Sequence, residues 1–318
     1  MFCSTIIPTI GRPSLARAVQ SALAQNFAEG EHEVIVVNDS GRPLPAAGWQ
    51  RSPQVELVHT QQRERSVARN TGAAVARGRY LHFLDDDDWL LTGGMRRLHK
   101  LAAASGAAWL HGGVQLMDRQ GTPTIQLHQR LTGNCFTQTI AGEWIALQAS
   151  LVDADLFHRI GGFNPRLAGP EDIDLIRRLA LVTDIAVTPE LIACVSMGSG
   201  GSTTNYGRHA AASRLAREAI LDMDGVFGRL RASATGPFWH GRLARAYLTS
   251  VAWNLGHGRP LRASSRLTFG LAGLGLAGRH LRRPSFWRAL SAPYQSHTFR
   301  RGAAEIQQVG QLTPARSQ

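Results

Sequence analysis

Four consecutive aspartates, Asp85, Asp86, Asp87 and Asp88, are the side chains of this sequence best suited to chemistry. They follow an apolar run at residues 80–84 and precede another at residues 89–91, which places them at the rim of a core. Adjacent carboxylates repel one another, and a nearby cation relieves that repulsion. Mg²⁺ and Mn²⁺ prefer carboxylate oxygens together with the phosphate oxygens of a ligand. The run therefore predicts a divalent-metal site, with a solvated acidic loop as the alternative.

A second acidic pair, Glu171 and Asp172, follows Pro170. Acidic side chains after a proline are typical of the first turn of a helix, where they stabilise the helix dipole. A carboxylate held beside a reaction site can also accept a proton as a general base. The two roles are compatible, because a helix that starts at a site directs its first side chains toward it.

The elements that must position these groups alternate between two periodicities over the first 90 residues. Short apolar runs predict buried parallel strands, and apolar residues at helical spacing predict helices between them. This order indicates an α/β fold with a doubly wound, mostly parallel sheet, whose ligands bind beyond the carboxyl ends of the strands. Asp39 and the four aspartates both fall there. The predicted strands cover residues 2–7, 34–37, 55–58 and 80–84, and the predicted helices begin near residues 15 and 66.

The charge of the chain is unevenly distributed. Residues 1–209 hold 19 basic and 19 acidic side chains, whereas residues 210–318 hold 16 basic and 4 acidic ones. The pattern is mixed up to about residue 206 and helical afterwards, with helices predicted over residues 208–230, 238–255 and 260–276. We therefore expect an α/β domain over residues 1–206, with halves at about 1–92 and 93–206, and a basic helical region over residues 207–318.

The basic region has three interpretations. It can be a helical subdomain with a solvated arginine face, a surface that binds anionic membrane lipids, or a nucleic-acid binder. The absence of a recognised nucleic-acid motif disfavours the last of these. We expect a cytoplasmic protein, because the three cysteines are widely spaced, the N-terminus does not resemble a signal peptide and no apolar run is long enough to span a membrane. If the basic region binds anionic lipids, the protein would be peripheral on the inner face of the membrane.

Four segments in this order resemble family 2 glycosyltransferases, whose Rossmann-like α/β fold is called GT-A. They are residues 4–9, 33–40, 68–88 and 160–175, which include the aspartate run and the acidic pair. The resemblance implies a GT-A domain followed by a C-terminal helical region. It also implies an inverting glycosyltransferase that moves a sugar from a nucleotide-diphospho-sugar, with UDP as the expected nucleotide, to an acceptor hydroxyl in cell-surface polysaccharide or glycolipid synthesis.

The resemblance also implies a role for each matching residue. Pro8 and Thr9 would line the nucleoside pocket, Asp39 would bind the base, and Arg69 would lie near the donor. Asp85 and Asp86 would contact the donor, and Asp87 would bind Mn²⁺ or Mg²⁺. Asp172, or alternatively Glu171, would be the general base. A glycine-rich loop at residues 198–203 would cover the diphosphate, although the arginine-x-histidine stretch common in the family is missing there.

These roles imply particular chemistry and partners. The metal would act on the diphosphate leaving group as a Lewis acid while a carboxylate takes the acceptor proton. The expected partners are a nucleotide-sugar donor and a glycan or lipid-linked acceptor. Two other functions remain open, namely a sugar-phosphate nucleotidyltransferase and a non-catalytic sugar- or membrane-binding relative. The first would need a better glycine-rich loop after residue 9, and the second would be expected to lack the acidic groups.

Overall fold

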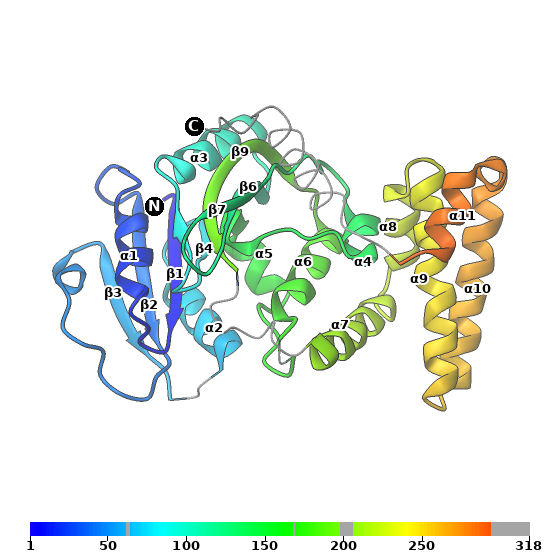
Figure 1. Ribbon diagram of the computed structural model, residues 1–318, viewed down its shortest axis with the longest axis horizontal. Coiled ribbons are helices and arrows are strands. Elements are labelled where there is room, and N and C mark those ends of the chain that lie inside the picture. Colours follow the sequence, from blue (N-terminus) through cyan, green and yellow to red (C-terminus); the bar gives the residue numbers. More distant parts are fainter. Residues whose placement is uncertain (62–63, 168, 198–205, 294–318) are drawn as a thin grey trace, which may run out of the picture.

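The computed structural model describes residues 1–61, 64–167, 169–197 and 206–293, and it shows a mixed α/β domain followed by helices (Figure 1). The glycine-rich segment at residues 198–203 lies outside the described residues. The central sheet has the order β3-β2-β1-β4-β8-β6-β9-β5, and β7 pairs with β6. The strands are β1 Cys3–Thr9, β2 His32–Asn38, β3 Val55–His59, β4 Tyr80–Phe83, β5 Trp89–Leu90, β6 Trp109–Met117, β7 Pro123–Leu127, β8 Ser150–Asp153 and β9 Ala186–Ser196.

The N-terminal half of the sheet is parallel and the other half is mixed. Parallel pairings join β3, β2, β1 and β4. Beyond β4, only β6 and β9 pair in parallel, and β8, β7 and β5 join their neighbours in antiparallel register. The α/β class expected from the sequence is confirmed, and the parallel portion of the sheet lies where the short apolar runs predicted it.

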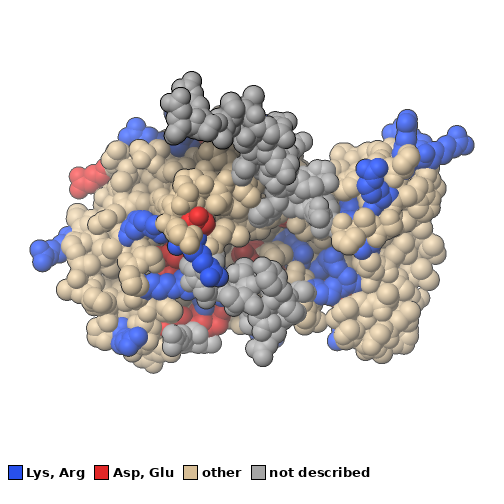
Figure 2. Space-filling view, in the orientation of Figure 1, with Lys and Arg blue, Asp and Glu red and all other residues tan. Residues whose placement is uncertain are grey.

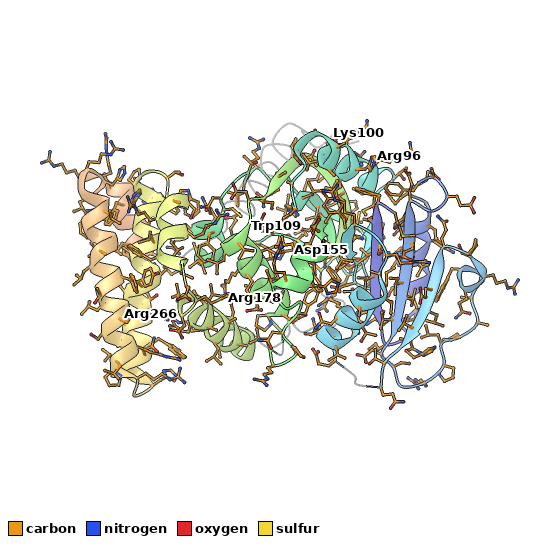
Figure 3. The ribbon with its side chains drawn as sticks, turned by 180° about the vertical axis from the view of Figure 1, so that it is seen from behind. Arg96, Lys100, Trp109, Asp155, Arg178 and Arg266 are labelled. Atoms are coloured by element: carbon orange, nitrogen blue, oxygen red, sulfur yellow. The ribbon has the colours of Figure 1, made fainter. Side chains whose placement is uncertain are left out.

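Helices cover both faces of the sheet because strand side chains alternate between them. In β1, Ile6 packs with α2, α5 and α6, and its neighbour Ile7 packs with α1 and α3. The surface of α3 exposes Arg96 and Lys100, whereas Trp109 of β6 is buried in the interior (Figure 3). These helices are α1 Leu15–Leu23, α2 Arg65–Val75, α3 Gly94–Ser105, α4 Phe136–Ala141, α5 Ala154–Arg159 and α6 Glu171–Val182.

The basic region is helical in its described part and shares the core of the domain. Leu230, Leu243 and Tyr247 are buried in the same cluster as Ile6. Arg266, buried at the junction of α10 with α7, binds Asp222 (Figure 3). None of the helices in the described part of the chain is long and apolar enough to cross a membrane. These helices are α7 Tyr206–Leu221, α8 Val226–Ser233, α9 Gly236–Gly256, α10 Pro260–Ala277 and α11 Pro284–Ser291.

Three local predictions need correction. The single helix expected over residues 208–230 is divided into α7 and α8, because Gly225 takes a left-handed φ of 75° at the start of α8. The sequence favours Ser14 as the N-cap of the first helix; Ser14 occupies that position in α1, but its side chain makes no capping hydrogen bond. The helix α11 was not anticipated from the sequence.

The close approach of α2 to the sheet requires a glycine. A Cβ atom at Gly72 would lie 2.5 Å from Ile6 Cγ2 and 3.0 Å from Val37 Cγ2. Any larger side chain would therefore push α2 away from β1 and β2. The same helix carries Arg65 and Arg69 toward the carboxyl ends of these strands, so the packing at Gly72 sets the position of both arginines.

We predict that Gly72→Val lowers the free energy of unfolding by about 2 kcal/mol, the usual scale of overpacking in a well-packed core. Chemical denaturation followed by circular dichroism measures this. The matched control is Ala74→Val, which places the same side chain at an exposed position of α2. Equal stabilities of the two variants would contradict the close packing of α2 on the sheet.

Candidate active site

The carboxyl ends of β1, β2 and β4 form a pocket of about 260 Å³. The register explains why: Thr9 lies opposite Asn38, and the Leu84 amide donates to the Ile6 carbonyl, which continues the alignment of β4 with β1 beyond its last residue. The residues predicted to bind the donor and the metal therefore come together. The lining consists of Pro8, Thr9, Ile10, Arg12, Asp39, Arg65, Arg69, Asp85, Asp86 and Asp87.

Asp39 lies at the end of the pocket nearest β2. Its backbone amide donates to the Thr9 carbonyl at 2.8 Å, which holds the turn after β2 against the end of β1. Its carboxylate accepts a hydrogen bond from the Thr60 hydroxyl at 3.1 Å. A carboxylate in such a position can accept hydrogen bonds from the N–H groups of a nucleotide base.

The four aspartates point in different directions. Asp86 accepts a 2.6 Å hydrogen bond from Thr9 and pairs with Arg12 at 3.2 Å. Arg12 also pairs with Asp87 at 2.9 Å. Asp88 is buried and accepts a hydrogen bond from the backbone amide of Ser196 at 2.7 Å, which ties the run to the end of β9.

Asp85 faces α2 and the acceptor half. It binds the guanidinium of Arg69, and Gln148 donates to it at 3.2 Å. Burial opposes its ionisation, but the charge and hydrogen bond of Arg69, together with the charges of Arg65 and Arg12, outweigh burial and keep the pKa of Asp85 below its ordinary value. Asp85 is therefore the carboxylate of the run most firmly held in its charged form.

Asp88 behaves in the opposite way. Burial, and then the charges of Asp85 and Asp87, raise the pKa of Asp88 well above its ordinary value. Burial also raises the pKa of Asp86, against the opposing effects of Thr9 and Arg12. The site thus holds more carboxylates than its arginines neutralise, and a cation would relieve the excess.

The carboxylates fit a divalent metal. Asp85, Asp87 and Asp88 each offer one oxygen, and these oxygens lie within 4.8 Å of one another. Oxygen ligands of this kind are those that Mg²⁺ and Mn²⁺ prefer. The structure therefore groups Asp87, the residue predicted to bind metal, with two of its neighbours in the run.

Glu171 and Asp172 begin α6, as the sequence predicted, and have different surroundings. Glu171 is 2% exposed in its side chain and pairs with Arg69 at 3.0 Å and with Arg65 at 3.2 Å. Asp172 forms no such pair with an arginine in the described part of the chain, and its carboxylate accepts from the backbone amide of Ile173 at 2.7 Å. Glu171 is thus held by α2, whereas Asp172 is not held by an arginine of the described residues.

The pKa of Asp172 suits proton transfer near neutral pH. Burial and the neighbouring charge of Glu171 raise the pKa of Asp172 to about 6, while Arg69 acts in the opposite direction. The influence of Arg69 and Asp85 on this carboxyl shows that it lies within electrostatic reach of the pocket. A base with such a pKa is ionised at neutral pH and still basic enough to accept a proton.

Several site residues were missed by sequence reasoning. Arg12, Arg65, Gln148 and Ser196 all contact the acidic groups of the site. The position of Arg65, one turn before Arg69, was a usable signal, because residues four apart share a helix face. Gln148 and Ser196 offered no local signal.

The family model described as glycosyl transferase family 2 matches residues 4–161, which contain the sheet ends that form the pocket. The domain over these residues belongs to this family, and the resemblance found in the sequence is confirmed. Glu171 and Asp172 lie just beyond the matched residues.

Two curated relatives match about a third of the chain. Succinoglycan biosynthesis protein ExoO of Rhizobium meliloti is 40% identical over 98 residues, which are 30% of this chain and 27% of that protein. The uncharacterized glycosyltransferase EpsJ of Bacillus subtilis is 32% identical over 101 residues, 30% of this chain and 28% of that protein. The aligned segment thus spans little more than a quarter of each relative.

Solved structures of TarS from S. aureus share the fold. The complex of TarS 1–349 with UDP-GlcNAc superposes with a TM-score of 0.60 at 15% identity, covering 88% of this chain and 92% of that one. TarS 1–349 without that ligand gives a TM-score of 0.58 at 14% identity, covering 92% and 81%. The likeness thus extends over the GT-A domain and beyond it.

Proposed function

We propose that this chain is a metal-dependent, inverting glycosyltransferase that moves a sugar from a UDP-sugar to the hydroxyl of a glycan or lipid-linked acceptor. The observation that carries the proposal is the pocket lined by Asp39, Arg69 and the carboxylates of residues 85–87. Asp172 is not part of the lining but lies within electrostatic reach of Arg69 and Asp85. The names of ExoO, a succinoglycan biosynthesis protein, and of TarS bound to UDP-GlcNAc support polysaccharide or glycolipid synthesis and a UDP-sugar.

Each protein group has a defined part in this proposal. Asp39 accepts hydrogen bonds from the base, and Pro8 and Thr9 border the nucleoside. Asp87, with Asp85 and Asp88, would hold Mn²⁺ or Mg²⁺. The bound ion supplies Lewis-acid stabilisation of the diphosphate leaving group. Arg12 and Arg69 hold the carboxylates in place, and their positive charge favours the departing diphosphate.

Asp172 is the proposed general base. It takes the proton from the acceptor hydroxyl as the oxygen attacks the anomeric carbon from the face opposite the leaving diphosphate, and this single displacement inverts the anomeric centre. Glu171 is the weaker candidate, because its carboxylate is buried and already pairs with two arginines. We assign Glu171 to positioning Arg69 and Arg65.

The alternative functions have less support. A nucleotidyltransferase would use the basic group after β1 to bind a nucleoside triphosphate, whereas Arg12 in that loop pairs with Asp86 and Asp87. A non-catalytic relative would have no need to keep either the aspartate run or the acidic start of α6. Both features are present and lie on the same side of the sheet.

We predict that Asp87→Asn abolishes metal-dependent turnover while the fold is retained, because the change removes one carboxylate charge from the metal site without changing side-chain shape. Release of UDP from a panel of UDP-sugars, starting with UDP-GlcNAc and with Mn²⁺ or Mg²⁺ present, measures turnover. Asp155→Asn is the control, since Asp155 is exposed on α5 (Figure 3). Turnover near that of the wild type would remove Asp87 from the metal site.

We predict that Asp172→Asn slows transfer at least about a hundredfold while donor affinity stays nearly unchanged. In the wild type, kcat/KM should fall tenfold per pH unit below about pH 6, because Asp172 becomes protonated there and can no longer accept a proton. The Asp172→Asn variant should not show this fall in kcat/KM. Initial rates across pH and calorimetric titration with the donor test both parts, and a large loss of donor affinity would move Asp172 to the donor side.

We also propose that residues 207–318 contact the inner face of an anionic membrane, while residues 1–206 carry out transfer. The outer helix α10 exposes Leu261 by 87% and Leu271 by 56%, and nearby Trp287 is exposed by 52%. Exposed arginines flank this apolar surface at residues 259 and 262 and at residues 279, 282 and 283. Apolar side chains bordered by cations are typical of surfaces that bind anionic lipid.

We predict that the full chain co-sediments with phosphatidylglycerol vesicles at low salt and is partly released at high salt, because salt screens the arginine charges within about 8–10 Å. Phosphatidylcholine vesicles should retain it poorly. Leu267 of α10 is also exposed, by 43%. The double variant Leu267→Ser/Leu271→Ser should bind anionic vesicles more weakly but remain sensitive to salt. If the chain binds both kinds of vesicle equally, or binds neither, the basic region has a purely structural role.

A further inference from the structure

A second cavity, of about 220 Å³, lies between α4, α7 and α9 and shares no lining residue with the donor pocket. Four arginines line it, and no carboxylate is among its described lining residues. Figure 2 shows basic side chains gathered in the hollow between the sheet domain and the C-terminal helices. We call it the arginine cavity, and its lining is Ile140, Ala141, Arg214, Arg217, Arg242, Arg245, Ala246 and Thr249.

Helix α11 holds two of these arginines in place. Nη1 of Arg242 donates to the carbonyls of Ala289 and Ala292 at 2.8 and 2.9 Å. Nη1 of Arg245 donates to the carbonyls of Leu290 and Ser291 at 2.6 and 2.8 Å. The last carbonyls of a helix attract cations, so both guanidinium groups are positioned before any ligand arrives.

Arg214 is held by its own helix and by α9. Its Nε lies 3.0 Å from Glu218, one turn along α7, and Nη2 donates to the Thr249 carbonyl at 2.6 Å. Glu218 is shared, because it also lies 3.8 Å from Arg266 and accepts hydrogen bonds from Ser250 and Asn254. One carboxylate behind Arg214 therefore does not balance the charge of the cavity.

Arg217 is the arginine of the cavity that lacks an ion pair. Its Nε is buried and has no hydrogen-bond partner, and its guanidinium forms no ion pair within the described part of the chain. Burial, and then the charges of Arg214 and Arg177, lower the pKa of Arg217 to about 9, against the opposing charge of Glu218. A cation in these surroundings is unfavourable by itself, and an anion in the cavity would remove the cost.

We propose that the arginine cavity binds a phosphate or diphosphate group. Guanidinium groups bind phosphate oxygens in pairs, and the several oxygens of phosphate can use more than one guanidinium at once. A carboxylate brings a single charge and two oxygens, which leaves part of the arginine set unmatched. The multiple charge of phosphate is the better match to four converging cations.

The position of the cavity assigns this group to the acceptor, a step that rests on the proposed function. Arg177 of α6 is buried and donates to the carbonyls of Thr139 in α4 and Ser213 in α7, at 3.4 and 3.1 Å. It thereby fixes α6 to two helices that wall the cavity. Asp172 lies five residues earlier on α6, about 7.5 Å along its axis. An acceptor whose phosphate is bound in the cavity would thus extend as far as Asp172.

Binding of inorganic phosphate to the full chain tests the site without any transferase assay. Calorimetry and thermal melts are run at constant ionic strength, with chloride replacing phosphate in the reference. Wild type should bind phosphate and diphosphate and melt at a higher temperature in their presence. Arg217→Gln should weaken phosphate binding about ten- to hundredfold, the scale for losing a hydrogen bond to a charged group.

Two further variants make the result specific. Arg231→Gln removes one charge from an exposed position of α8 outside the cavity and should bind phosphate as the wild type does. Asp87→Asn should also retain phosphate binding, so a failure of the transferase proposal does not affect this test. In phosphate-free buffer, Arg217→Gln should melt no lower than wild type, because it removes a buried cation that has no ion pair in the described part of the chain. Equal phosphate affinity in Arg217→Gln and wild type, or no binding to wild type, overturns the site.

The source of the phosphate is tested with glucose 1-phosphate. If the phosphate belongs to an acceptor, the cavity must leave room for a sugar attached to it. The Kd of glucose 1-phosphate should then lie within about threefold of the Kd of inorganic phosphate, a difference of less than 1 kcal/mol. Arg217→Gln should weaken the binding of glucose 1-phosphate by the same factor as the binding of inorganic phosphate. Binding of free phosphate alone overturns the acceptor role and leaves the cavity as a site for a free anion.

Discussion

The buried guanidinium of Arg69 is the contact on which both halves of the site depend. It joins Asp85, at the end of β4, to Glu171, at the start of α6. Burial disfavours its charge, but the two carboxylates more than compensate and raise the pKa of Arg69. Removing one partner of such a buried pair commonly lowers the free energy of unfolding by about 3–5 kcal/mol. Separation of the two halves of the domain at Arg69 would therefore be unfavourable.

The pairing of the arginines divides four chemically identical aspartates into different states. Arg69 fixes Asp85 in its charged form, and Arg12 bridges Asp86 and Asp87. Asp88 is left buried beside charged neighbours, so its pKa rises. The number of carboxylates therefore matters less than the position of each relative to two arginines. A divalent cation bound among Asp85, Asp87 and Asp88 would neutralise the negative charge that these arginines leave uncompensated.

The sequence predicted those parts of the fold and site that local pattern determines. Short apolar runs identified β1 to β4, and the rule that ligands bind beyond the carboxyl ends of parallel strands placed Asp39 beside the aspartate run. Contacts between distant segments could not be predicted in this way. Arg69 and Glu171 are 102 residues apart, and nothing near either one indicates the other. The break between α7 and α8 and the helix α11 were missed because a single glycine and a short amphipathic segment give weak signals.

Helix α6 gives the acceptor half a fixed geometry. Its first turn carries Glu171 into the pair with Arg69 and also carries Asp172, the proposed base. Its second turn carries Arg177 toward α4 and α7. Because these residues lie on one helix, the separation between the proposed base and Arg177, which joins α6 to two walls of the arginine cavity, is set by helix geometry rather than by a loop. An acceptor bound at both places would have its hydroxyl and its phosphate located by the same element. Positioning of this kind favours reaction, because a reactant held at two points loses less freedom on reaching the transition state.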